Sequence, residues 1–414
     1  MSSKPKVATP DFIPMFTAEK FDADEWAELF KKAGARFAGP VAEHHDGFSM
    51  WDSVHTKWNA AKMGPKRDVT GELAAAIRKQ GMRFMVAMHH AENWWFFPHW
   101  RKDFDTADPQ YAGLYGATHD LDFPDENVEW DQQSKPSKEF LDLWENKLVE
   151  VVDKYEPEYI WFDFGLAFIH EQYKQDFLAY YYNKGVEWGR GGTVVTYKWD
   201  NLPPGTAMVD LELGKMSEQT YYEWITDNTV DDGEGWCYIK DIGYRTPGSL
   251  IHYLIDNVSK NGYLLLNVGP KPDGTIPDEA RDCLLGIGEW LEVNGEAIYD
   301  TVPWSTAGEG PTKMAKGGAF SDTREEIVHY TAQDIRFTVK DNVLYATCLG
   351  WPEKKFTIET LKKLYPDEVQ SVQMLGVGQD LTWKMTGEGL MIERPDEKPC
   401  AHAFVFKVTR SKTR

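Results

Sequence analysis

The chain has 414 residues, of which 42% are hydrophobic, and this is enough apolar material for one large domain and a smaller one. Its formal net charge of -21 would repel a phosphate backbone, so we expect no nucleic-acid partner. No apolar run approaches the roughly 18 residues that a membrane span needs, and the opening segment MSSKPKVATPDF lacks the apolar core of a signal peptide.

Apolar segments typical of β-strands recur along the first two thirds of the chain, at residues 36–45, 83–90, 159–164, 192–199, 206–213 and 263–269. Helical patterns are interleaved with them, at residues 22–35, 70–81, 140–157, 249–262 and 278–295. Asp22 is a capping signal for the first helix, and Gly81 is expected just beyond the end of the second. Repeated β-then-α order predicts parallel strands joined by helical crossovers.

The length of this part favours an eight-fold β/α barrel, because its nearly continuous apolar strands end in polar or aromatic side chains. An open doubly wound sheet is the alternative, although no glycine-rich phosphate motif follows any strand. Further along, polar and apolar residues alternate between turn signals, which is typical of an antiparallel β-sandwich. We therefore predict a barrel domain over residues 1–309 and a sandwich domain over residues 310–414.

Asp163 stands at the far end of the apolar strand at 159–164, where a β/α barrel places its catalytic groups. Trp161 and Phe162 beside it predict a water-poor aromatic pocket in which a carboxylate can act as a nucleophile and a sugar can stack. Two structural alternatives are that Asp163 caps the following segment or that it pairs with a lysine inside the barrel.

Cleavage of a glycosidic bond needs a second carboxylate, which protonates the departing oxygen. Glu212, at the end of a later strand, is the first candidate, and Glu223 is its rival. Asp210 alternates with Glu212 on the same face of the strand, so a supporting role is expected for it.

Two pairs of adjacent histidines end the first two predicted strands, His44 with His45 and His89 with His90. Neighbouring residues of a strand point to opposite faces, so an adjacent pair seldom ligates one ion, and we predict no metal site. The four cysteines form no C-x-x-C pair and indicate no zinc site either. We expect one histidine of each pair to hydrogen-bond sugar hydroxyls; the alternative is a core imidazole with a satisfied partner.

Five segments resemble the signature sequences of the α-L-fucosidases of glycoside hydrolase family 29: EHHDGFSMWDS, GPKRDVTGELAAAIRKQGMRF, YIWFDFG, DNVSKNGYLLLNVGPKPDGTIPDE and IGEWLEVNGEAIYDTVPW. The resemblance runs from about residue 15 to residue 312. It implies a retaining exo-α-L-fucosidase that needs no cofactor, with an imperfect barrel, a following sandwich and a fucosylated glycan as substrate. Such enzymes are commonly exported, so an extracellular or periplasmic location is expected.

The resemblance also implies roles for individual residues. The nucleophile of the family falls on Asp163, and a D-x-E-R-G segment of its members assigns the acid/base to Glu212, with Glu223 in reserve. The residues implied in binding the sugar are His44, His45, His89, Trp51, Trp161 and Trp236.

Three departures from the family pattern are visible. Leu213 replaces the arginine of the D-x-E-R-G segment, and His90 stands where an arginine is common. The first strand of the family, which ends in H-W-G, is not found, so we predict a barrel that lacks strand one and has an edge to cover. The alternatives to a fucosidase are a fucose-binding barrel that has lost turnover and an exo-glycosidase acting on α-L-galactosides or β-D-fucosides.

Overall fold

The computed structural model describes residues 9–120, 135–233, 235–313 and 316–411. Residues 1–8, which carry most of the opening segment tested for a signal peptide, lie outside the described residues. The chain divides into two compact units: unit 1 contains residues 1–31, 35–209 and 270–275, and unit 2 contains residues 32–34, 210–269 and 276–414. Among the described residues, no helix is long and apolar enough to cross a lipid bilayer.

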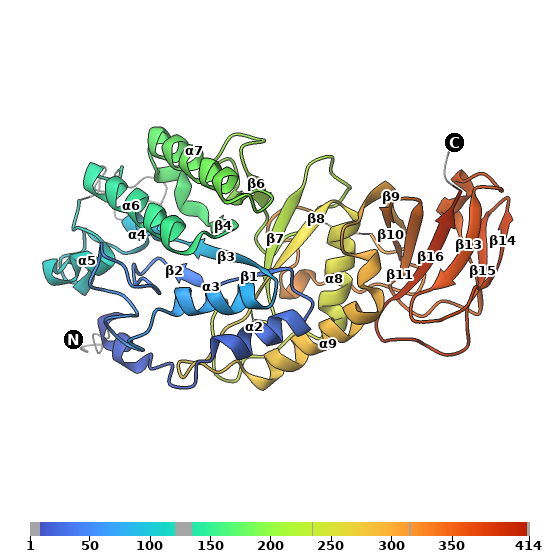
Figure 1. The fold of residues 1–414 in the computed structure, drawn as a ribbon, viewed down its shortest axis with the longest axis horizontal. Helices are drawn as coiled ribbons and strands as arrows, with labels where there is room; N and C mark the ends of the chain where they lie inside the picture. The colour runs from blue at the N-terminus through green and yellow to red at the C-terminus, as the bar shows by residue number, and fades with distance from the viewer. Residues whose placement is uncertain (1–8, 121–134, 234, 314–315, 412–414) are drawn as a thin grey trace. The chain divides into compact units, whose positions relative to one another are not determined.

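Unit 1 is built around parallel strands (Figure 1): β1 (Phe37–Ala38), β2 (Val41–Glu43), β3 (Arg83–Met88), β4 (Tyr159–Phe162) and β5 (Val194–Lys198). Strands β1 and β2 both pair with β3, β3 pairs with β4, and β4 pairs with β5. Strand β6 (Met208–Asp210) follows in the chain. All four residues of β4 are buried, as expected for a strand covered on both faces.

Helices alternate with these strands: α1 (Thr9–Phe12), α2 (Ala23–Lys32), α3 (Val69–Lys79), α4 (His90–Phe96), α5 (Ala112–Tyr115), α6 (Lys138–Tyr155) and α7 (Glu171–Trp188). Short 3₁₀ turns lie at η1 (Ile13–Met15), η2 (Asp105–Ala107), η3 (Pro109–Tyr111) and η5 (Phe164–Phe168). Helix α3 packs on β3 and on α6, and α6 packs on α7. Both end signals are confirmed, since Asp22 Oδ1 accepts from the Glu25 amide at 3.1 Å and Gly81 has φ +73°. Within the described residues no strand precedes α2, in agreement with the predicted lack of strand one.

Unit 2 begins with a second parallel pair, β7 (Trp224–Thr229) and β8 (Gly262–Asn267). Helix α8 (Pro247–Ser259) packs on β8 and on α9 (Asp278–Asn294), which leads into the turn η6 (Gly295–Ala297) (Figure 1). Strand β7 was not predicted from the sequence, because its last four residues are polar although all are buried. Hydrogen bonds compensate their burial: Thr226 Oγ1 donates to the Leu211 carbonyl at 2.6 Å, and Asn228 Nδ2 donates to Asp322 at 3.0 Å.

Two antiparallel sheets complete unit 2, with strand orders β13-β16-β11-β10-β9 and β12-β15-β14. Their strands are β9 (Val302–Glu309), β10 (Ile335–Lys340), β11 (Val343–Cys348), β12 (Lys355–Ile358), β13 (Val369–Met374), β14 (Thr382–Thr386), β15 (Gly389–Glu393) and β16 (Phe404–Arg410), with 3₁₀ turns at η7 (Arg324–Glu326) and η8 (Glu359–Lys363). One apolar core joins the sheets, with Phe356 of β12 against Phe406 of β16 at 5.0 Å between ring centroids.

The predicted fold class is confirmed: parallel strands alternate with helices as in a β/α barrel, and an antiparallel β-sandwich follows. Strand β9 pairs antiparallel with β10, so residues 302–309 lie in the first of the sandwich sheets. The division of the chain into domains at residue 309 stays a prediction.

Candidate active site

Asp163 is the first residue after the buried strand β4, and its backbone there is extended, with φ -89° and ψ -157°. It occupies the N-cap position of η5, yet its side chain makes no capping hydrogen bond, so the capping alternative is wrong. Its side chain is 12% exposed, with Oδ1 3.5 Å from Lys198 Nζ and Oδ2 3.5 Å from His89 Nδ1. A nearly buried carboxylate with cationic and imidazole neighbours is typical of a functional site.

Lys198 ends β5 beside Asp163, and its side chain is only 2% exposed. Its ammonium group lies 5.0 Å from the ring centroid of Trp161 and 4.8 Å from that of Phe164. The lysine alternative is therefore confirmed for Asp163, and it is compatible with catalysis, because a nearby cation favours the ionised, nucleophilic form of a carboxylate. The sequence signal was present: Lys198 is a charged residue at the carboxyl end of an apolar strand, as Asp163 is.

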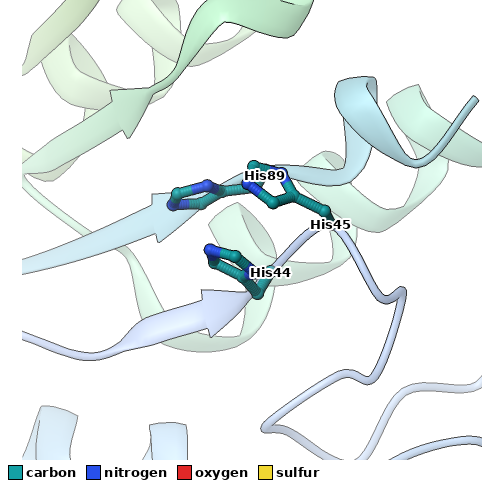
Figure 2. Close-up of side chains that lie close together, drawn as sticks. All are labelled: His44, His45 and His89. Atoms are coloured by element: carbon teal, nitrogen blue, oxygen red, sulfur yellow. The ribbon is translucent and has the colours of Figure 1, made fainter. Parts of the chain in front are cut away.

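Three imidazoles gather where β2 and β3 end (Figure 2). The ring centroid of His44 lies 3.9 Å from that of His45 and 4.6 Å from that of His89, and those of His45 and His89 are 5.0 Å apart. The expectation that adjacent histidines face opposite sides is wrong for His44 and His45, because β2 ends at Glu43 and strand alternation ends with it. Both members of this pair therefore reach one cluster.

His45 is held in this cluster by contacts with Glu92 and Phe96, and both His45 and His89 have lowered pKa values. Glu92 of α4, itself 2% exposed, places Oε2 2.7 Å from His45 Nδ1, and Phe96 stacks on the His45 ring at 4.4 Å between centroids. Burial lowers the pKa of His45 to about 4. Burial, with His44, His45 and Lys198 nearby, lowers the pKa of His89 well below its usual value. Neutral imidazoles both donate and accept hydrogen bonds, which suits them to sugar hydroxyls.

His90 belongs to a different environment, which we call the Glu43 network: Glu43, Ser49, His90 and Lys147. Glu43 is fully buried and accepts from Lys147 Nζ at 2.9 and 2.8 Å and from Ser49 Oγ at 2.7 Å, and His90 Nδ1 contacts it too. Burial opposes ionisation of Glu43, but Lys147 and His90 outweigh it and lower its pKa to about 2. The core-imidazole alternative is therefore confirmed for His90. Sequence reasoning missed Glu43 and Lys147, because a buried ion pair between distant segments leaves no local pattern.

The three tryptophans expected around the sugar lie in different settings. Trp161 borders the histidine cluster, with its ring 5.0 Å from that of His89. Trp51 has no exposed surface, and its Nε1 donates to Glu150 at 2.9 Å, so this indole packs inside unit 1 and has no surface to offer a sugar. Trp236 lies in unit 2, after β7, at φ +52°. Its carbonyl accepts from Asn267 Nδ2 at 3.0 Å.

The two candidates for the second carboxylate both lie in unit 2, at opposite ends of strands. Glu212 follows the carboxyl end of β6 and is half-buried, and its carbonyl accepts from the Phe320 amide at 2.7 Å. Asp210, the last residue of β6, is buried. Glu223 precedes the amino end of β7, is exposed, and accepts from the Tyr263 hydroxyl at 2.7 Å. Barrel active sites lie at the carboxyl ends of strands, so this placement favours Glu212.

The lowered pKa of the buried His45 predicts that the protein loses stability in acid. His45 has its pKa lowered to about 4, whereas an unfolded histidine titrates near 6.5, so between these values the unfolded chain binds more protons. The free energy of unfolding should therefore fall as the pH drops from about 6.5 to 4. His45→Ala should reduce the total fall in the free energy of unfolding over this pH range by on the order of 2 kcal/mol, measured by urea unfolding at a series of pH values. Replacing the exposed His55 should leave the slope as it is; an undiminished slope in His45→Ala would contradict the prediction.

Comparisons with known proteins agree over nearly the whole chain. A sequence profile described as alpha-L-fucosidase matches residues 3–296, and one described as alpha-L-fucosidase C-terminal domain matches residues 321–409. The tissue alpha-L-fucosidase of Mus musculus is 30% identical over 420 residues, covering 98% of this chain and 81% of the relative. The plasma alpha-L-fucosidase of Homo sapiens is 30% identical over 428 residues, covering 98% of this chain and 79% of the relative. The Thermotoga maritima alpha-fucosidase solved in complex with fucose superimposes with a TM-score of 0.73 at 31% identity, covering 98% of this chain and 83% of that one.

Proposed function

Because the chain belongs to the α-L-fucosidase family, a family of retaining glycoside hydrolases, we propose that it releases terminal α-L-fucose from fucosylated glycans, with Asp163 as nucleophile and Glu212 as acid/base. The observation that carries the assignment of the nucleophile is the position of Asp163. Asp163 directly follows β4, and its carboxylate keeps a small exposed surface and lies within 3.5 Å of both Lys198 and His89. Location outside the cytoplasm stays a prediction.

In the first step Asp163 attacks the anomeric carbon of the bound sugar, and the bond to the departing oxygen breaks as Glu212 gives that oxygen a proton. In the second step Glu212 takes a proton from water, the water oxygen attacks the same carbon, and Asp163 leaves. Two inversions leave the configuration of the sugar unchanged. Lys198 supports this cycle by placing a positive charge 3.5 Å from Asp163 Oδ1, beside the proposed nucleophile.

Recognition of the sugar is assigned to the neutral imidazoles and to Trp161. His44, His45 and His89 offer ring nitrogens to ring hydroxyls, and the indole of Trp161 offers an apolar face close to them. A sugar that combines hydroxyls with a methyl group fits this division of polar and apolar contacts.

The assignment of the acid/base predicts a result that depends on the leaving group. Glu212→Gln should lower kcat/KM on a fucosylated oligosaccharide by roughly 10²- to 10⁴-fold, because the departing alkoxide then leaves without a proton. The loss should be far smaller on 2,4-dinitrophenyl α-L-fucoside, since this phenolate leaves unaided. Release of fucose and of dinitrophenol measures both.

Glu223→Gln is the matched control, because that carboxylate is exposed at the amino end of β7. It should keep wild-type rates on both substrates. A large loss in Glu223→Gln together with normal rates in Glu212→Gln would overturn the assignment. Absence of turnover by the unaltered chain on any α-L-fucoside would overturn the proposed function itself.

A further inference from the structure

We propose that His44, His45 and His89 also form a binding site for a divalent transition-metal ion such as Zn²⁺, and that the ion and a sugar exclude one another there (Figure 2). Each of the three histidines offers a ring nitrogen that lies within 4.8 Å of those of the other two. Imidazole nitrogens around tetrahedral zinc are about 3.3 Å apart, so small rotations of the rings would bring them to ligand distance.

Within the described part of the chain, the burial of His89 without hydrogen bonds to its ring nitrogens also points to a ligand. This residue is 6% exposed, and among the described residues neither of its ring nitrogens has a hydrogen-bond partner. A buried imidazole without hydrogen-bond partners costs free energy even with Asp163 Oδ2 at 3.5 Å, and a ligand recovers it by taking up a lone pair or the ring proton. Figure 2 shows the ring of His89 close to the rings of His44 and His45.

Glu92 gives the site the supporting group that zinc-bound histidines commonly have. Its carboxylate oxygen lies 2.7 Å from His45 Nδ1, and this contact leaves Nε2 of the same ring for a metal ion. Asp163 and Glu92 also offer oxygens within 4.8 Å of His45 and His89 ligand atoms. Two carboxylates beside three neutral ligands offset the charge of a divalent cation, whereas Lys198 opposes it from 3.5 Å beyond Asp163.

The metal ion and a sugar are expected to exclude one another because both need the same ring nitrogens. A sugar hydroxyl and a metal ion both need the ring nitrogens of His44, His45 and His89, and each nitrogen serves one of them at a time. Binding of the ion stands independently of the proposed function, whereas competition with the sugar rests on it.

The first experiment measures binding of the metal alone. Zn²⁺ is titrated calorimetrically into the full chain in a buffer that does not chelate metals, and Co²⁺ absorption reports the geometry of the site. His89→Ala and His44→Ala should each weaken the affinity at least tenfold, and circular dichroism checks that each variant is folded. His55→Ala, at an exposed residue, is the matched control and should bind as the wild type does. Equal affinity in wild type, His44→Ala and a folded His89→Ala would overturn the site.

The second experiment tests exclusion. Saturating L-fucose should abolish the Co²⁺ absorption, and Zn²⁺ should raise KM for an aryl α-L-fucoside while kcat stays constant. An absorption that fucose leaves unchanged would overturn exclusion and leave the metal site in place. Metal binding in a chain without any turnover would instead overturn the proposed function, so the two failures are distinguishable.

Discussion

Replacing Asp163 with alanine is expected to lower kcat on an aryl α-L-fucoside by at least about a thousand-fold, because the variant lacks the carboxylate that we propose forms the covalent intermediate. The variant should fold, since the side chain of Asp163 makes no capping hydrogen bond and keeps a 12% exposed surface. Initial rates of nitrophenol release by wild type and variant give the ratio. Circular dichroism of both proteins checks that the loss is chemical.

Azide separates loss of a nucleophile from general damage. In Asp163→Ala the small anion can enter the space left by the carboxylate and attack the anomeric carbon, which should restore nitrophenol release and give a fucosyl azide of inverted configuration. Asp142→Ala, at an exposed acid on α6, is the control and should keep wild-type rates without azide. Retention of more than about a tenth of the activity by Asp163→Ala, or an azide product of retained configuration, would assign the nucleophile elsewhere.

Lys147→Met is expected to lower the free energy of unfolding by about 3–5 kcal/mol, the largest stability effect that we predict. The Lys147 side chain is 1% exposed and its ammonium group contacts both oxygens of the fully buried Glu43, so its removal leaves that carboxylate without its lysine counter-ion. Protonation of Glu43 would remove the unpaired charge at the lowest free-energy cost. The decrease in the free energy of unfolding should therefore be smaller at low pH. Urea unfolding followed by tryptophan fluorescence measures the change.

Two further variants test whether the cost comes from the orphaned charge. The double variant Glu43→Gln with Lys147→Met should be more stable than Lys147→Met alone, because it contains no buried unpaired charge. Lys138→Met breaks the exposed pair of Lys138 with Asp142 on the same helix and should change stability by less than about 0.5 kcal/mol. A Lys147→Met variant that unfolds like Lys138→Met would show that water reaches Glu43.

The strands that could be predicted are those that contain a continuous run of apolar residues, because such a run is visible without knowledge of distant contacts. Strand β4 is buried at every residue and ends before one charged group, so both the strand and the position of Asp163 at its end could be predicted. Strand β7 could not, because its residues Thr226–Thr229 are buried through hydrogen bonds made by distant segments. Helix α7 was also missed, because three consecutive tyrosines hide the spacing of its buried residues Phe177, Tyr181 and Gly185.

The site was predictable in its residue types and less so in its geometry. Strand alternation was applied to His44 and His45 one residue beyond the point where β2 ends, and this error removed a shared ligand site from consideration. The family resemblance also implied Trp51 as a sugar contact, whereas its buried indole donates a hydrogen bond to Glu150. Which face a side chain presents depends on where an element stops, and residue types do not determine that position.

At the end of β2 the Glu43 network and the histidine cluster are covalently coupled. A single peptide bond joins Glu43, fixed by Lys147 and Ser49, to His44, which faces the histidine cluster. Substitutions that relax the Glu43 network are therefore expected to shift His44, a proposed sugar-binding residue, so changes in these buried charges and in sugar recognition are coupled. An engineer who wished to alter sugar preference by moving His44 would have to redesign the buried charges behind it in the same step.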